Sequence, residues 1–190
     1  RGNIGVRFVD TEQTNFGWVG DGSGLGFEPL DPANPQVETS RKYQHTLPSF
    51  NLAFDLTDEW VLRFAANKAL TRPDPIDMSS RLNLDFEDFE GSGGNPNLEP
   101  YTTVNYDMSV EWYPESGGSY GVGFFYKDLE SFISSGSNTQ DIDGDEYDIR
   151  RPVNTDGGTI NGVEFQFHTP FDFLPGFLQY FGINGSYTYV

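Results

Sequence analysis

The sequence of 190 residues contains no cysteine, so it can form neither a disulfide bond nor a thiolate metal site. It also lacks any apolar run near the roughly 20 residues that a membrane-spanning helix needs, and its mean hydropathy is −0.52. Basic residues are scarce, since 11 Lys and Arg against 29 Asp and Glu give a formal net charge of −18. These absences exclude a helical membrane protein. They also argue against nucleic acid as a partner, because phosphates need cationic side chains.

The residues that are abundant point to an all-β protein. Aromatics make up 16% of the chain, with 17 Phe and 10 Tyr, while 22 Gly and 12 Pro interrupt it too often for long helices. The clearest strand runs from Tyr101 to Tyr113, where side chains alternate with the two-residue period of a strand whose faces meet different surroundings. One face carries Thr102, Val104, Tyr106, Met108, Val110 and Trp112, and the other carries Thr103, Asn105, Asp107, Ser109 and Glu111.

Six further segments alternate in the same way, and the links between them are short and long in turn. The predicted strands are 2–12, 43–56, 60–70, 101–113, 119–129, 159–169 and 178–190. Short links fall at 57–59, 114–118 and 170–176, and long loops span 13–42, 72–98 and 130–158. In an up-and-down meander all short links then lie at one end of the sheet and all long loops at the other, as in outer-membrane barrels.

Periodicity alone leaves two architectures open. A transmembrane barrel turns its apolar rows to lipid, whereas a soluble lipocalin-like barrel or β-sandwich turns them inward. Seven meandering strands do not close a small barrel, and an open sheet with aromatic rows would be insoluble. Trp60 follows one short link, and Trp112 and Tyr113 precede another, where an interfacial aromatic girdle would lie. We therefore predict a segment of an antiparallel, up-and-down transmembrane β-barrel, with the soluble domain as the alternative.

Several strings resemble the barrel of TonB-dependent receptors, especially those of the Xanthomonas and Caulobacter type. The resemblance covers nearly all of the chain except the long loops. It rests on the opening "GNIGVRFVDTE", on "LPSFNLAFDLTDEWVLRFAANKALTRPDP" at 47–75, on "GNPNLEPYTTVNYDMSVEWYPESGGSYGVGFFYKDLESFI" at 94–133 and on "INGVEFQFHTPFDFLPGFLQYFGINGSYTYV" at 160–190.

The resemblance implies about seven strands from the C-terminal part of a 22-stranded barrel in the outer membrane of a Gram-negative bacterium. It also implies contact with lipid and lipopolysaccharide, and TonB as a partner. Because the plug domain and the TonB box of that family are absent from this chain, we expect a piece of a longer protein. Polar side chains of the wall are expected to face a wet or plug-filled lumen, since they would be costly against lipid. These are Arg63, Asp107, Glu111, Glu164 and Gln166.

The densest acidic cluster, "DIDGDEYD", superficially resembles a calcium loop. Its candidate ligands are Asp141, Asp143 and Asp145. An EF-hand needs Gly at its sixth position and Glu at its twelfth, but here Gly144 is fourth and Pro152 is twelfth. A solvated acidic loop is therefore the favoured interpretation, with adventitious binding of Ca²⁺ or Mg²⁺ as the alternative.

No catalytic motif stands out in the sequence. The two histidines, His45 and His168, fall in different predicted strands without a metal-binding spacing, and there is neither a nucleophile elbow nor a phosphate-binding glycine loop. We therefore expect no enzyme and no cofactor.

Aromatic and acidic residues are mixed in the long loops, and this mixture suits sugars. A ring offers a flat apolar face to sugar C–H groups, while carboxylates accept hydrogen bonds from hydroxyls. The candidate ligand contacts are Trp18, Phe86, Phe89 and Tyr147; the alternative is that they pack the loops together. The resulting hypothesis is a receptor that imports a scarce solute with energy from TonB. Acidic loops disfavour anions, so an oligosaccharide is preferred over a ferric siderophore.

Overall fold

The computed structural model describes residues 1–17, 19–20, 37–142 and 144–190, and most of them lie in strands. No helix among them is long and apolar enough to cross a membrane. A single 3-10 helix, η1, spans Gly176–Tyr180. The strands are β1 (Gly2–Gly17), β2 (Val19–Gly20), β3 (Val37–Asp55), β4 (Trp60–Thr71), β5 (Leu82–Asp85), β6 (Glu90–Gly93), β7 (Tyr101–Trp112), β8 (Ser119–Ile142), β9 (Asp145–Pro170) and β10 (Gly182–Tyr189).

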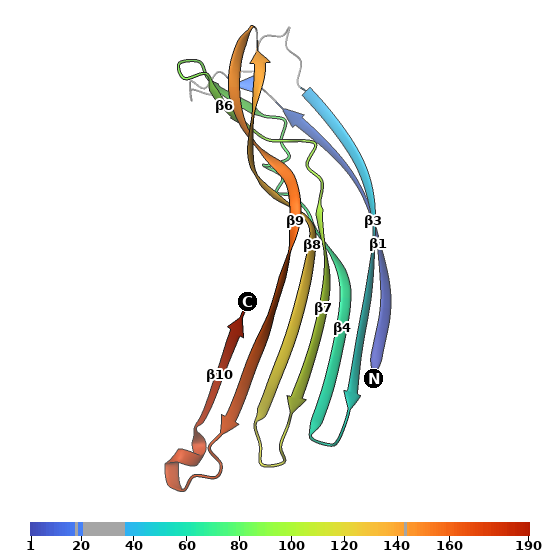
Figure 1. Ribbon diagram of the computed structural model, residues 1–190, viewed down its shortest axis with the longest axis vertical. Coiled ribbons are helices and arrows are strands. Elements are labelled where there is room, and N and C mark those ends of the chain that lie inside the picture. Colours follow the sequence, from blue (N-terminus) through green and yellow to red (C-terminus); the bar gives the residue numbers. More distant parts are fainter. Residues whose placement is uncertain (18, 21–36, 143) are drawn as a thin grey trace.

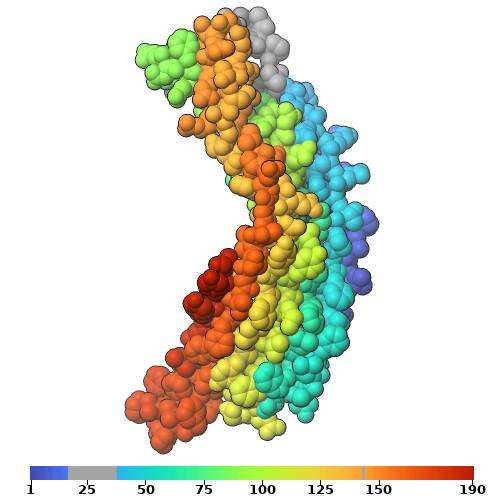
Figure 2. All heavy atoms as spheres, in the orientation of Figure 1, coloured from blue at the N-terminus to red at the C-terminus, as the bar shows by residue number. Residues whose placement is uncertain are grey.

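Seven of these strands form the wall of a curled half-barrel. They pair antiparallel in the order β1-β3-β4-β7-β8-β9-β10, which confirms the predicted up-and-down meander (Figure 1). The turns that join β3 to β4, β7 to β8 and β9 to β10 lie together at what we call the short-turn end. The opposite, long-loop end carries the small strands β5 and β6 beside the tips of β8 and β9, and the whole molecule is crescent-shaped (Figure 2).

The strand register brings apolar side chains into continuous rows across the wall. Residues that pair across antiparallel strands point to the same face, so each row runs through several strands without a break. One row is Leu52, Phe64, Met108, Phe124, Val163 and Tyr189, and the next is Phe54, Leu62, Val110, Val122, Phe165 and Tyr187. Many of these side chains are exposed, and the rows do not face each other across a sealed interior.

Aromatic rings lie on this apolar face at two positions along the strands, one near the short-turn end and one nearer the long-loop end. Near the short-turn end, Trp112 stacks on Trp60 with ring centroids 5.8 Å apart and on Tyr120 at 5.2 Å. Six residues further along β7, Tyr106 meets Tyr126 at 6.3 Å. At about 3.3 Å per residue, the two levels are roughly 20 Å apart along the strand. This is the scale of the apolar band and its flanking girdles in outer-membrane barrels.

Hydrogen bonds tie the first two short turns together. Thr57 Oγ1 accepts from the backbone N–H groups of Glu59 at 3.2 Å and Trp60 at 3.1 Å. The Glu59 carboxylate accepts from the Glu115 backbone N–H at 2.9 Å and from Trp112 Nε1 at 3.1 Å. These two bonds, the backbone bond first, hold the pKa of Glu59 below its ordinary value, so the carboxylate stays charged and keeps both donors.

Several predicted strand limits were wrong at the long-loop end. The segment 130–158 is not a loop, because β8 and β9 stay paired up to Ile142 and Asp145, and Gly144 adopts the positive φ of 95° that a tight hairpin turn favours. Strands β1 and β3 likewise continue into the predicted loop 13–42, and 72–98 contains β5 and β6. Small polar residues dominate these extensions, so hydrophobic alternation did not reveal them. The last strand begins at Gly182 rather than 178, because η1 precedes it.

We predict that a charge at two adjacent phenylalanines of β8 will destabilise the barrel to different extents. Phe124 belongs to the apolar rows, and Phe125 pairs with Asp107 on the polar face. Phe124→Arg is expected to lower the free energy of unfolding by about 2 to 4 kcal/mol, the cost of Arg near the middle of a bilayer, and Phe125→Arg by clearly less. Urea titration of the intact barrel in lipid vesicles measures both. A larger loss for Phe125→Arg would contradict the assignment of the faces.

Candidate functional site

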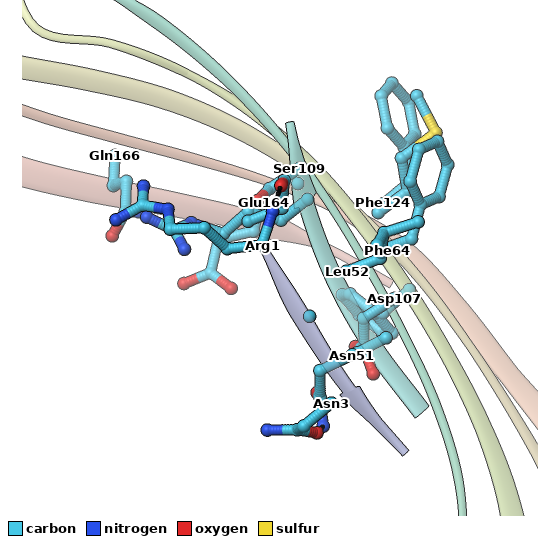
Figure 3. A pocket seen from close by; sticks show the side chains of 17 residues that line it. Arg1, Asn3, Asn51, Leu52, Phe64, Asp107, Ser109, Phe124, Glu164 and Gln166 are labelled. Carbon is cyan, nitrogen blue, oxygen red and sulfur yellow. Dashed lines mark hydrogen bonds between the residues drawn. The ribbon is translucent and has the colours of Figure 1, made fainter. Parts of the chain in front are cut away.

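The concave face of the wall carries a hollow that polar and apolar residues line together. Figure 3 shows Arg1, Glu164 and Gln166 on the side around which the strands bend, and Phe64 and Phe124 on the opposite side. The hollow has a volume of about 660 Å³ and draws its lining from six of the seven wall strands. In a closed barrel this face borders the lumen. The sheet therefore separates a polar concave surface from an apolar convex one.

All five wall residues singled out in the sequence lie in one region. Arg63, Asp107, Glu164 and Gln166 line the hollow, and Glu111 is the partner of Arg63, whose Nε lies 2.9 Å from Glu111 Oε2. Glu111 also accepts hydrogen bonds from Ser109 Oγ at 3.1 Å and from Tyr113 OH at 2.8 Å. With a side chain only 13% exposed, Glu111 is the most enclosed carboxylate of this network, and its three partners compensate its charge.

A second candidate region lies at the long-loop end, in what we call the cap: β5, β6 and the tip of the β8–β9 hairpin. Strand β6 pairs in parallel with β9 from Glu90↔Asp148 to Ser92↔Arg150. Beneath this pairing is a small apolar core of Leu82, Leu84, Tyr147 and Ile149, with Ile142 against it. Ile149 is fully buried. The cap is therefore a packed unit rather than a set of free loops.

The cap brings together three of the four predicted ligand contacts. The ring of Tyr147 meets Phe86 at 6.2 Å and Phe89 at 5.6 Å. Tyr147 is only 4% exposed and packs in the core, whereas about half of each phenylalanine remains exposed. The Asp85 carboxylate accepts from the backbone N–H groups of Glu87 at 3.0 Å and Asp88 at 3.3 Å, which shapes the turn that presents both rings. The fourth contact, Trp18, lies outside the described residues.

The acidic cluster of the β8–β9 tip forms no cation site in the described part of the chain. Asp141 uses Oδ1 to accept from the Gly144 backbone N–H at 3.2 Å, a local turn bond. Across the described ranges, no three His, Cys, Asp or Glu side chains are grouped as metal ligands. Asp143 lies outside those ranges, and Asp145 pairs with Ile142 at the hairpin end. The two histidines are in β3 and β9, which are not neighbours in the sheet.

A group of hydrogen bonds that the sequence did not reveal holds the "NPNLEP" segment, residues 95–100, between β3 and β9 at the long-loop end. We call the side chains that make these bonds, Arg41 and Asn154, the staple. The Arg41 guanidinium donates to the backbone carbonyls of Asn97 and Leu98 and reaches Glu99 Oε1 at 2.9 Å. Asn154 donates to the Glu99 carbonyl at 2.9 Å and accepts from its N–H at 2.8 Å. Since Arg41 is in β3 and Asn154 in β9, the segment joins distant strands. Strand β7 begins at Tyr101, directly after Pro100, which is the start that was predicted for the strand 101–113.

The family of the chain follows from comparison with known proteins. The family model described as "TonB dependent receptor-like, beta-barrel" matches residues 1–190, the entire chain. The chain belongs to this family. This TonB-dependent receptor barrel is therefore an outer-membrane structure, and the soluble alternative is wrong. No curated protein matches the chain.

Solved structures of similar fold include receptors for ferric enterobactin, siderophores and a hemophore. The G324V mutant of the ferric enterobactin receptor PfeA from Pseudomonas aeruginosa has 17% identity and a TM-score of 0.61, over 89% of this chain and 31% of that one. The hemophore receptor HasR of Serratia marcescens, in complex with its hemophore HasA and heme, has 14% identity and a TM-score of 0.58, over 88% and 29%. The siderophore receptor PirA of Acinetobacter baumannii has 17% identity and a TM-score of 0.53, over 69% and 22%. The receptor barrel chain thus spans less than a third of each, and identities this low show the fold alone.

We predict that Glu111 stabilises the wall of the receptor more than an exposed ion pair does. Glu111→Gln keeps the side-chain shape but leaves Arg63 without its ionic partner. The free energy of unfolding should fall by about 1 to 2 kcal/mol, discounted from a fully buried pair because Arg63 is partly exposed. Lys42→Gln is the control, since it breaks a mostly exposed pair with Glu12 and should cost less than about 1 kcal/mol. Equal losses in urea titrations of the two variants would contradict the role given to Glu111.

Proposed function

We propose that this barrel segment serves a receptor that binds a scarce solute at the cell surface and imports it with energy from TonB. The observation that carries the proposal is the division of the sheet into an apolar convex face and a polar concave face, in a chain that matches the receptor family throughout. Such a wall passes a polar solute while it sits in lipid and lipopolysaccharide. The chemistry is binding and translocation, and no step requires a catalytic group.

In this proposal the long-loop end faces the outside of the cell and the short-turn end faces the periplasm. Outer-membrane barrels have short periplasmic turns and longer extracellular loops. The cap then lies where solute arrives. The staple of Arg41 and Asn154 holds the loop that carries the cap in place, and the polar concave wall continues from this end into the lumen.

For the solute we infer an oligosaccharide, bound at the cap. Phe86 and Phe89 expose rings beside a buried tyrosine, which is a surface for the C–H faces of sugars. On β5, β6 and β9 the carboxylates of Asp85, Glu90 and Asp148 line a hollow of about 290 Å³ together with Asn83, Ser92 and Arg150. The two rings are not part of this lining, so the hollow supplies hydrogen-bond partners beside the ring cluster rather than around it. Carboxylate acceptors suit hydroxyl donors, and a net charge of −18 disfavours a free anion.

A ferric siderophore is the second candidate, and the structural neighbours favour it. Those structures are of a ferric enterobactin receptor, a siderophore receptor and a hemophore receptor. Arg150, which lines the hollow at the cap, is the one cation on that lining and would contact an anionic chelate.

Growth of a deletion strain separates the two solutes. With the native receptor restored, growth on limiting oligosaccharide should recover and growth under iron limitation should not change. A receptor with Phe86→Ala and Phe89→Ala together should lose most of the recovery, because stacking on an aromatic ring is lost. Ile76→Ala is the control, an exposed apolar residue of the same loop outside the ring cluster. A growth defect confined to iron limitation would replace the oligosaccharide with the siderophore.

A further inference from the structure

The turn between β9 and β10 differs in kind from the other two short turns. The β3–β4 and β7–β8 turns are polar, with Asp58 and Glu59 in one and Glu115 and Ser116 in the other. The third turn, 170–182, reads "PFDFLPGFLQYFG" and carries a single charge, Asp172. Five aromatic residues and two leucines occupy its 13 positions. An exposed apolar patch of this size on a turn that met only water would have no explanation, because such patches mark contacts with lipid or protein.

Most side chains of this turn are exposed, and a backbone hydrogen bond and ring contacts fix their arrangement. The Phe171 backbone N–H donates to the Phe181 carbonyl at 2.9 Å, which closes the base of the turn, and η1 occupies its tip. Phe171 packs edge-on against Phe173 at 6.2 Å, and Phe177 against Phe181 at 6.1 Å. No residue of η1 is buried, and Phe177 and Tyr180 are 70% and 82% exposed. The turn therefore presents a pre-formed aromatic surface.

The turn is also continuous with the aromatic girdle of the wall. The row of Trp60, Trp112 and Tyr120 ends across β9 at Phe167, four residues before Phe171. Tyr120 OH lies 2.8 Å from Thr169 Oγ1, beside the turn. Figure 1 shows the turn at the same end of the sheet as the turns that join β3 to β4 and β7 to β8.

We propose that this aromatic turn, residues 170–182, is an anchor that inserts into the headgroup and upper acyl region of the membrane at the short-turn end. Phenylalanine and leucine side chains enter the acyl boundary, while Tyr180 keeps its hydroxyl among the headgroups, as amphipathic rings do at membrane interfaces. Its near absence of charge fits insertion into lipid. The polar β7–β8 turn stays in water. The proposal concerns the level of this turn in the membrane, and it holds whichever solute the receptor imports.

A fluorescent probe at single cysteines of the intact receptor tests this in phospholipid vesicles. Because these 190 residues contain no cysteine, Phe177→Cys can be labelled with a nitrobenzoxadiazole dye, and Ser116→Cys in the polar turn is the matched control. Lipids with a nitroxide near the headgroup should quench the dye at Phe177 at least about threefold more than at Ser116, and aqueous iodide should show the reverse order. Heat-dependent migration on a gel confirms that each labelled barrel is folded.

Two results would overturn the anchor. Iodide quenching at Phe177 as strong as at Ser116 would place the turn in water, and quenching by neither reagent would show that protein covers it. Tyr180→Cys provides a second labelled position, so that a local effect of the dye at Phe177 does not decide the outcome.

Discussion

The antiparallel register of the wall is the constraint on which the rest of the structure depends. Because residues paired across strands point to one face, an unbroken register keeps every apolar row in phase from Leu52 in β3 to Tyr189 in β10. A slip of one residue in any strand would exchange its two faces. Such a slip in β4 would put Arg63 on the apolar convex face, and one in β7 would put Glu111 there. The turn bonds of Glu59 help to hold the register at the short-turn end.

The same register places the candidate sites at the two ends of one wall. Strands β8 and β9 run past the aromatic level of Tyr126 and form the tip on which β6 docks. The wall therefore builds the cap as well as the lumen surface, and a rigid cap positions Phe86 and Phe89. At the other end, the β9–β10 turn extends the girdle. The proposed solute site and the proposed membrane anchor thus lie at opposite ends of the same strands.

The wall could be predicted from sequence because its alternation is local, whereas the cap could not. Two-residue periodicity identified all seven wall strands, and the short links agree with the turns after β3 and β7. The extensions of β8 and β9 mix small polar and charged residues with a few apolar ones, without a regular alternation. Their pairing depends on the partner strand, so neither segment alone revealed it. The parallel pairing of β6 with β9 and the staple at Arg41 join residues more than 50 positions apart. The sequence predicted that the loop aromatics bind a ligand together. It did not predict that Tyr147 would be buried against the rings of Phe86 and Phe89, because that burial depends on the fold of the cap.

Whether the convex face meets lipid and the concave face meets water is tested most directly by spin labels along β7. Single cysteines at 103–112 in the intact receptor, each carrying a nitroxide, report collisions with apolar oxygen and with a water-soluble nickel chelate. The account predicts a period of two, with oxygen favoured at Val104, Tyr106, Met108 and Val110 and the chelate favoured at Asn105, Asp107 and Ser109. Equal accessibility at neighbouring positions, or the opposite phase, would contradict it.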